Sequence, residues 1–285
     1  METEHEQGPA VLYHREGRIG VLTLNRPENR NALSAEMLKD FNAALDAIEL
    51  DGEVRVCVLR AVGPTFCSGF DLAQTSASTL STLADPWGDR ERLLKWINLA
   101  LRIWEFPCPV IAQVHGHCLA GGVLLLLCSD LVFIEDKCVV GWPRLPMGAG
   151  FMDGAMSHLI GQRRAKQISY VVGSRISGSE AERWGLANFA FPAAELESET
   201  MAFAKRVAKT PRNVLEIRKA AISRAQKGLS FRESLLAGVE WDAIAHVDPA
   251  VNETRGLVRK HGMKAVIAAF EDTDDYVAEL EGREG

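Results

Sequence analysis

Residues 65–72 read TFCSGFDL and follow an apolar, β-branched run at residues 54–62, with Gly63-Pro64 between them. The run predicts a buried strand, and the glycine-proline pair predicts its end. A second glycine segment, LAGG at residues 119–122, follows another predicted strand at residues 110–114 and leads into the apolar residues 123–128. Each segment therefore places glycine-rich backbone beside a buried strand.

Glycine loops of this kind can present backbone amides to an anion. The second loop opens onto a short buried helix predicted at residues 123–128, and a helix amino terminus has unsatisfied N–H groups and a partial positive charge. If the N–H groups of Phe70 and Gly121 converge, they form an oxyanion hole, in which each donor is worth about 3 to 4 kcal/mol of transition-state stabilisation. The alternative is that both loops are turns shaped only by packing.

The periodicity along the chain predicts an α/β core followed by helices. Strands are expected at residues 18–25, 54–62, 110–114, 131–134 and 138–142, helices at 34–48, 90–105 and 123–128, and a turn at 116–122. Ser179 and Glu182 have the spacing of a capping box before Gly185, which predicts a short helix. Beyond residue 191 the patterns are helical, over residues 195–209, 212–226, 231–246 and 250–270.

Composition excludes several classes of protein. The 285 residues carry a formal net charge of -6, which gives no basic surface for general nucleic-acid binding, and neither a GxGxxG strand-helix junction nor a Walker lysine motif is found. The first ten residues are acidic and polar, unlike a signal or transit peptide, so a cytoplasmic location is expected. The most apolar stretch, residues 118–128, is too short for a membrane span. Six scattered cysteines lack metal-ligand spacing and are expected to be reduced core thiols.

Four motifs in chain order carry a resemblance to a known family. They are NRP at 25–27 with NALS at 31–34, FCSGFDL at 66–72, PVIA at 109–112 leading to Gly121-Gly122, and Ile176-Ser177 leading to Gly185-Leu186. Together they cover residues 10–210 and resemble the crotonase superfamily, the enoyl-CoA hydratase/isomerase family. The helical tail is similar to the trimerisation module of that family.

The resemblance implies a fold, a ligand and an assembly. The fold is an α/β spiral of repeated ββα units over residues 1–208, with a C-terminal α-helical oligomerisation module over residues 209–285. The ligand is a coenzyme A thioester, bound as substrate in fatty-acid or related acyl-CoA metabolism, with no permanently bound cofactor and no metal. A homotrimer or homohexamer is expected, without nucleic-acid or membrane partners.

The resemblance also implies roles for individual positions. Phe70 and Gly121 match the two residues whose N–H groups hold the thioester oxygen. Arg26 matches the region that lines coenzyme A, and residues 67–70 match the loop that runs past the adenine. The Phe70 ring either contacts the acyl group or packs in the core. Trp142 likewise either lines the pocket or packs in the core. Asp71 is expected to cap the amides of the segment that follows it. The expected binding set is Arg26, Cys67, Ser68, Phe70, Asp71, Leu72, Gly121, Leu124 and Trp142.

The two glutamates that hold water in typical hydratases of this family are missing. Their positions match Leu124 and Arg144, so hydration by paired carboxylates is doubtful. Asp153 lies where other members place an acidic catalytic residue and is the best remaining base, although an aspartate there can equally be a helix N-cap.

Two further side chains have open roles. Arg144 either stabilises an enolate or an acyl carboxylate, or it pairs with a surface acid. His117 either acts near neutral pH or is a hydrogen-bonded core imidazole. The leading hypothesis is an enzyme that stabilises a thioester enolate, with hydration, isomerisation and hydrolysis left open. The alternative is a non-catalytic acyl-CoA binding protein.

Overall fold

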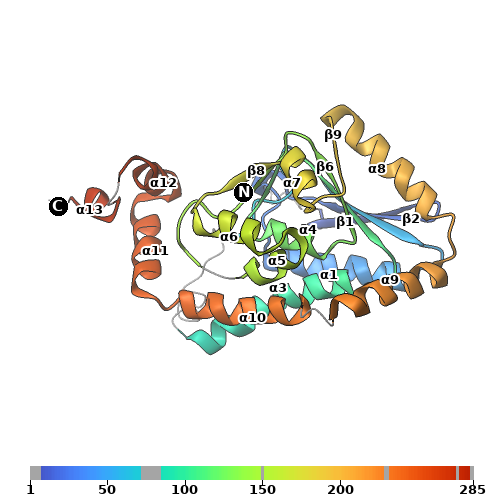
Figure 1. Ribbon diagram of the computed structural model, residues 1–285, viewed down its shortest axis with the longest axis horizontal. Coiled ribbons are helices and arrows are strands. Elements are labelled where there is room, and N and C mark those ends of the chain that lie inside the picture. The colour runs from blue at the N-terminus through green and yellow to red at the C-terminus, as the bar shows by residue number, and fades with distance from the viewer. Residues whose placement is uncertain (1–7, 72–84, 149–150, 228–230, 274–275, 283–285) are drawn as a thin grey trace, which may run out of the picture.

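A six-stranded sheet forms the centre of the molecule in the computed structural model, which describes residues 8–71, 85–148, 151–227, 231–273 and 276–282 (Figure 1). The strand order is β1-β2-β3-β4-β6-β9, and only β1 is antiparallel to its neighbour. Their bounds are Val11–Glu16 for β1, Ile19–Leu24 for β2, Val56–Ala61 for β3, Val110–Val114 for β4, Leu131–Glu135 for β6 and Phe189–Phe191 for β9. The strands expected at residues 18–25, 54–62, 110–114 and 131–134 are therefore confirmed, and β1 and β9 are additions to them.

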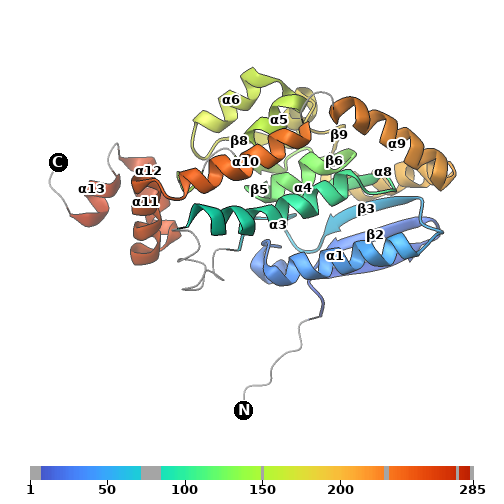
Figure 2. The same cartoon turned by 90° about the horizontal axis from the view of Figure 1, so that it is seen from below.

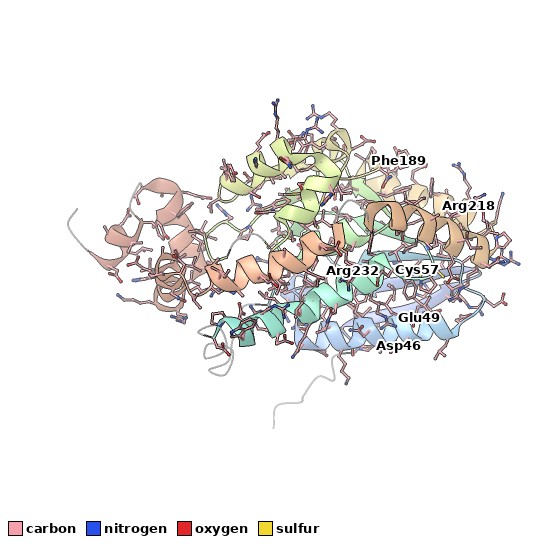
Figure 3. The ribbon with its side chains drawn as sticks, turned by 60° about the horizontal axis from the view of Figure 1, so that its bottom comes forward. Asp46, Glu49, Cys57, Phe189, Arg218 and Arg232 are labelled. Carbon is pink, nitrogen blue, oxygen red and sulfur yellow. The ribbon has the colours of Figure 1, made fainter. Side chains whose placement is uncertain are left out.

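Both faces of this sheet are covered, which explains why the strands read as continuous apolar runs. Val21 and the other apolar residues on its face of the sheet pack against α8 (Ala193–Val207). Leu22 and Leu24 face the larger core on the opposite side, which includes residues of α1 (Ala35–Leu50) and α3 (Pro86–Trp104). Arg102 of α3 donates to Asp46 at 2.5 Å and to Glu49 at 3.1 Å. Figure 3 labels these two acidic residues on α1. The layers are thus a helix on one face, the sheet, and helices on the other.

A smaller sheet lies beside the main one. It consists of β5 (His117–Leu119), β7 (Val139–Gly141) and β8 (Arg175–Ser177), with β5 parallel and β8 antiparallel to β7. The expected turn over residues 116–122 is wrong at residues 117–119, because these residues pair with β7 and also with the loop at residue 67. In the second pairing, Cys67 N donates to His117 O at 3.1 Å, and Leu119 N donates to Cys67 O at 2.9 Å. A strand of three residues is too short to show the alternation of apolar and polar residues from which strands are predicted.

Shorter helices connect the strands: η1 (Pro27–Asn29), α4 (Gly122–Cys128), α5 (Asp153–Ile160), α6 (Gln162–Tyr170) and α7 (Gly178–Trp184). The predicted capping box of α7 is in the wrong register. Ser177, not Ser179, is the N-cap: its hydroxyl accepts from Glu180 N at 3.1 Å, and the Glu180 carboxylate accepts from Ser177 N at 3.0 Å. Gly185 ends the helix with φ 81°, as expected.

The C-terminal part is helical throughout its described residues. It comprises α9 (Arg212–Lys227), α10 (Phe231–Ala245), α11 (Pro249–His261), α12 (Met263–Asp272) and α13 (Tyr276–Glu281). The single helical pattern expected over residues 250–270 is interrupted at Gly262, whose φ of 83° cannot continue a right-handed helix. Figures 1 and 2 show α10 alongside α3, with α11–α13 gathered at one end of the molecule.

The structure bears on two expectations from composition, one about the cysteines and one about membrane-spanning helices. All six cysteines are unpaired and buried, which confirms them as core thiols. Among the described residues, no helix combines the length and apolar character needed to cross a membrane. The Ser, Thr, Gly and Pro content of residues 74–89 predicts a mobile segment, and most of this segment lies outside the described residues. Its last residues, from Pro86 on, form the first turn of α3.

Asn31 holds the turn after β2 against the loop that follows β3. It is fully buried with φ 52°, a left-handed conformation that asparagine tolerates better than most residues. Its side chain accepts from Arg26 N at 2.8 Å and donates to Val62 O at 2.9 Å and Thr65 O at 2.7 Å. One amide group therefore fixes the start of the 65–72 segment.

Replacing Asn31 with alanine should lower the free energy of unfolding by about 3 kcal/mol, because buried backbone groups lose their partners and each costs roughly 1 to 3 kcal/mol. Urea unfolding followed by circular dichroism measures this. Asn29→Ala is the matched control, since Asn29 is exposed and its side chain donates to the neighbouring Glu28. Equal stability of both variants would contradict the role of Asn31.

Candidate functional site

The loop at residues 65–71 is fixed on both sides by backbone pairing. On one side it pairs with β5 through Cys67, and on the other Leu33 N donates to Gly69 O at 2.8 Å while Asp71 N donates to Leu33 O at 3.1 Å. Since β3 and β4 are parallel neighbours, the segments after them leave the same edge of the sheet. The two glycine loops are therefore brought together by the sheet itself.

Gly69 touches the second loop directly. Its φ is 97°, and a Cβ atom there would lie 2.8 Å from Ala120 Cβ and 3.1 Å from Gly121 N. Gly122 is equally constrained, because its Cβ would lie 2.8 Å from Cys67 O. Side chains at these positions would separate the loops, so the glycines serve close backbone approach.

The amides of Phe70 and Gly121 remain available in this arrangement. In the part of the chain that the structure describes, neither N–H donates a hydrogen bond to another residue. The first turn of α4 closes without them: Val123 N donates to Ala120 O at 2.9 Å and Leu124 N to Gly121 O at 3.2 Å. Two adjacent backbone donors without partners are suited to receive an oxygen that develops negative charge.

The Phe70 ring lies next to these amides. A Cβ atom on Gly121 would lie 3.1 Å from Phe70 Cε2, so the ring covers the Cα of Gly121. The same ring meets Trp96 and Phe151 edge to face, with centroids 5.7 Å and 5.5 Å away. Of the two roles expected for Phe70, packing in an aromatic cluster is present, and this cluster borders the amide pair.

Cys67 and Ser68 contribute backbone rather than reactive groups. The Cys67 side chain is fully buried, and burial raises the pKa of its thiol to about 12 although a hydrogen bond with the Gly69 backbone lowers it in part. The thiol is therefore neutral near pH 7 and is not a nucleophile. Ser68 N donates to Arg30 O at 3.1 Å.

Arg26 and Asp71 form a buried ion pair. Arg26 NH1 lies 3.1 Å from Asp71 Oδ2 and 3.2 Å from Ala32 O, and both charged side chains are 9% exposed. The guanidinium thus joins the NRP and FCSGFDL motifs, a contact that their order in the sequence did not indicate. The amides that Asp71 was expected to cap, and Leu72 itself, lie outside the described residues.

The positions matched to the hydratase glutamates hold no carboxylate. Leu124 is buried within α4. Arg144 pairs with Glu271 of α12, with Arg144 Nε donating at 3.0 Å, which is the surface-acid alternative. Burial, followed by the charge of Arg144, lowers the pKa of Arg175. Trp142 is buried, and its indole N–H has no partner among the described residues.

Asp153 is the first residue of α5, and the N-cap is Met152, which forms no side-chain cap. The expected capping alternative therefore does not describe Asp153, although an acid in a first turn is favoured by the helix dipole. Its side chain is half-buried and forms no hydrogen bond with a described residue. Phe151, two residues earlier, connects this segment to Phe70.

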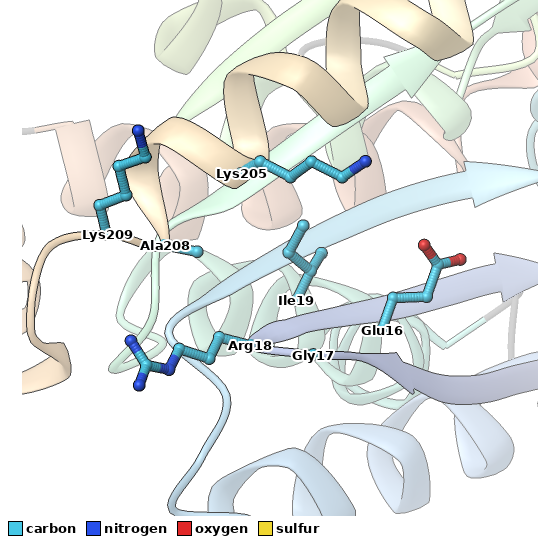
Figure 4. A pocket seen from close by; sticks show the side chains of 7 residues that line it. All are labelled: Glu16, Gly17, Arg18, Ile19, Lys205, Ala208 and Lys209. Atoms are coloured by element: carbon cyan, nitrogen blue, oxygen red, sulfur yellow. The ribbon is translucent and has the colours of Figure 1, made fainter.

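His117 has an exposed side chain in β5, so the core-imidazole alternative is wrong. A surface hollow of about 460 Å³ lies elsewhere, between Ile19 at the start of β2 and the carboxyl end of α8 (Figure 4). Lys205, Lys209 and Arg18 line it, and lysines in that position balance the dipole of a helix carboxyl end. Because Arg26 follows the opposite end of β2, this hollow is separate from the amide pair.

The comparison with known proteins agrees with this geometry. A family model for enoyl-CoA hydratase/isomerase matches residues 14–248. The chain belongs to this family. It is 31% identical over 247 residues to a Mycobacterium tuberculosis protein assigned as an enoyl-CoA hydratase, covering 77% of this chain and 74% of that protein.

Solved structures of the family have the same fold over nearly the whole chain. One from Novosphingobium aromaticivorans, assigned as an enoyl-CoA hydratase/isomerase, has a TM-score of 0.87 at 30% identity and covers 97% of this chain and 99% of its own. An enoyl-CoA hydratase from Mycobacterium smegmatis has a TM-score of 0.83 at 26% identity, with coverage of 96% and 93%. The enoyl-CoA hydratase/isomerase fold with C-terminal helices is thereby confirmed.

The sequence analysis missed Trp96 and Phe151 as neighbours of Phe70. Trp96 lies on the apolar face of a predicted helix, where one tryptophan is indistinguishable from other core residues. Phe151 lies in a glycine-rich segment without periodicity. Only the folded chain brings the three rings together.

The chain's family membership predicts a strong effect of Gly69→Ala. The methyl group would strain a left-handed position and push Ala120 and Gly121 away, which should lower turnover of an acyl-CoA substrate roughly 100-fold or more, as loss of one oxyanion donor does. Steady-state kinetics measures this. Gly52→Ala is the control, because nothing lies within 4 Å of its Cβ position. Full activity of Gly69→Ala would show that the loop contact is dispensable.

Proposed function

We propose that this enoyl-CoA hydratase/isomerase family member is a catalyst that binds a coenzyme A thioester with its carbonyl oxygen between the N–H groups of Phe70 and Gly121. The observation that supports it is the pair of unpartnered amides, held together by Gly69 against the second loop. Coenzyme A thioesters are the substrates of the family. Residues 67–68, Arg26 and Asp71 then border the coenzyme A side, and Leu124 and Trp142 the acyl side.

The amide pair suits enolate chemistry. When a base takes the proton from the carbon beside the thioester carbonyl, the electron pair moves onto the carbonyl oxygen, which becomes an oxyanion. Two N–H donors fixed in position before the reaction stabilise that charge without reorganisation. For a 3-enoyl thioester, protonation of the resulting dienolate at the γ-carbon then completes an isomerisation. In a hydration the enolate arises differently: water loses a proton to the base as its oxygen adds to the β-carbon of a 2-enoyl thioester, and protonation at the α-carbon completes the reaction.

Asp153 is the proposed base. Leu124 and Arg144 stand where the family resemblance implies glutamates, and neither can transfer a proton at neutral pH. The Asp153 carboxylate follows Phe151, whose ring meets Phe70, so its segment adjoins the amide pair. A single carboxylate favours proton shuttling within one substrate over the two-carboxylate hydration route.

A second candidate function is acyl-CoA binding without turnover. The engagement of Arg144 by Glu271 and the apolar burial of Leu124 favour it, because both positions are then purely structural. A turnover screen against 2-enoyl, 3-enoyl, saturated, aromatic and cyclic-ketone acyl-CoA thioesters, with bound ligand quantified by mass spectrometry, separates the two. Product from any thioester excludes the binding protein.

Several wider properties belong to the same proposal. The division into a core at residues 1–208 and a helical module at 209–285 places the boundary between α8 and α9. A homotrimer or homohexamer, an action in acyl-CoA metabolism and the lack of a permanent cofactor follow the family resemblance. A cytoplasmic location is part of the proposal as well. Sedimentation velocity of the full chain tests the assembly.

Asp153→Asn should abolish most turnover, by about 100-fold or more, while the dissociation constant for the thioester changes little, because the amide keeps the shape and loses the basic oxygen. Isothermal titration and steady-state kinetics together test this. Asp248→Asn is the matched control, since Asp248 caps α11 by accepting from Ala250 N at 2.9 Å. If both variants retain full turnover, Asp153 is not the base.

A further inference from the structure

A buried ionic cluster joins α3 to the C-terminal helices. It consists of Asp89 and Arg92 of α3, Asp242 and His246 of the α10 end, and Arg255 of α11. His246 Nδ1 lies 2.5 Å from Asp89 Oδ2, and His246 Nε2 lies 3.5 Å from Asp242 Oδ2. Arg92 NH2 lies 2.7 Å from Asp89 Oδ1. Within the described residues this is not a metal-binding arrangement.

The burial of this cluster is costly. Asp89 is 0%, His246 5% and Asp242 7% exposed. Removing charges from water costs several kcal/mol for each ion, and an apolar replacement is often as stable, so such groups are retained where they fix a position. The cost of burial offsets what these ion pairs contribute to stability, so the cluster is a candidate positioning device.

The charges depend on one another. Burial alone would raise the pKa of Asp89, but the hydrogen bond and charge of His246 and the charge of Arg92 lower it. A lowered carboxyl pKa means that this contribution to stability is present at neutral pH and is lost as the pH falls through that pKa. Burial also lowers the pKa of Arg255, and the charges of Asp89 and Asp242 partly offset this.

One side of the cluster holds the loop before α5. Arg255 NH2 donates to Met147 O at 2.8 Å. At Gly148, a Cβ atom would lie 2.6 Å from Asp242 Oδ1 and 3.0 Å from His246 Nε2, so the backbone of the loop lies directly on the two side chains. Phe151 and Asp153 follow within five residues.

On its other side, the cluster is connected to the Phe70 ring through α3. Asp89 and Trp96 are seven residues apart and both are buried, so they lie on one face of the helix about two turns apart. Trp96 meets the Phe70 ring. The cluster is therefore connected to both aromatic residues that contact Phe70. It reaches Trp96 through α3, and it reaches Phe151 through the loop before α5.

We propose that Asp89, Asp242 and His246, with Arg92 and Arg255, are positioning residues that hold the 147–148 backbone, and through it Phe151 and Asp153, in register with the amide pair. The effect on the reaction rests on the proposed function, whereas the hold on the loop does not. The C-terminal helices α10 and α11 are thereby part of the acyl site's construction.

Gly148→Ala tests the contact without removing a charge. Displacing Asp153 by even about 1 Å should lower kcat on the order of 100-fold, with the KM and the thioester dissociation constant little changed. Gly52→Ala is again the control. Unchanged kcat in Gly148→Ala would overturn the proposal.

His246→Leu removes the link to both carboxylates, and His246→Asn restores a donor toward Asp89. We expect a large fall in kcat for the leucine variant and partial recovery for the asparagine variant. Lys219→Met is the matched control, because it breaks another buried pair, with Asp130 at 2.6 Å, that ties α9 to the core away from the loop. Equal loss of kcat in His246→Leu and Lys219→Met would mean that general destabilisation is responsible.

Amide hydrogen exchange in α5 separates this proposal from the proposed function. His246→Leu and Gly148→Ala should accelerate exchange at residues 155–157, and Lys219→Met should not. If the wild type turns over no thioester, the catalytic function fails while exchange still decides whether the cluster holds the loop. Unchanged exchange in both cluster variants, or faster exchange with undiminished kcat, contradicts the positioning role.

Discussion

The contact between Gly69 and the Ala120–Gly121 backbone is the constraint on which the site depends. Because Gly69 lacks a Cβ and adopts φ 97°, its backbone approaches the second loop without obstruction. The parallel pairing of β3 with β4 brings both loops to one edge of the sheet, and pairing with Leu33 and β5 prevents the first loop from withdrawing. Asn31 and the Arg26–Asp71 pair then fix the two ends of that loop. Within this arrangement, the amides of Phe70 and Gly121 have no hydrogen-bond partner among the residues that the structure describes.

Much of this could be predicted from local patterns. Apolar runs revealed the central strands because both sheet faces are covered, and the two glycine loops stood out because glycines directly after buried strands are typical of close backbone approach. What could not be predicted depends on contacts distant in sequence. The strand at residues 117–119 exists through pairing with β7 and with Cys67. The helix break at Gly262 requires a backbone angle that periodicity does not report, and Ser177 rather than Ser179 is the cap because Ser177 ends β8. The contact of Phe70 with Phe151 and the contact of His246 with Asp89 each join segments more than fifty residues apart.

The reaction is harder to derive from the sequence than the fold is, because it depends on which side chains surround the amide pair. Oxyanion stabilisation comes from backbone groups, which persist through side-chain substitution, whereas proton transfer needs particular carboxylates. Here Leu124 belongs to the core and Arg144 to a surface ion pair with α12. We therefore propose Asp153 for proton transfer, and we propose that the C-terminal helices fix its position through the loop before α5. On this proposal, the helical end of the chain would contribute to the chemistry as well as to the proposed assembly.

The most direct measurement is isotope-edited infrared difference spectroscopy of an acyl-CoA bound to the wild-type protein, with carbon-13 at the thioester carbonyl. Hydrogen bonds from Phe70 and Gly121 would withdraw electron density from the carbonyl bond, so we predict a band at lower frequency than in the free thioester, and a return toward the free value in Gly69→Ala. A bound thioester whose carbonyl band matches that of the free molecule in water or lies above it would contradict the central claim that these two amides form an oxyanion hole.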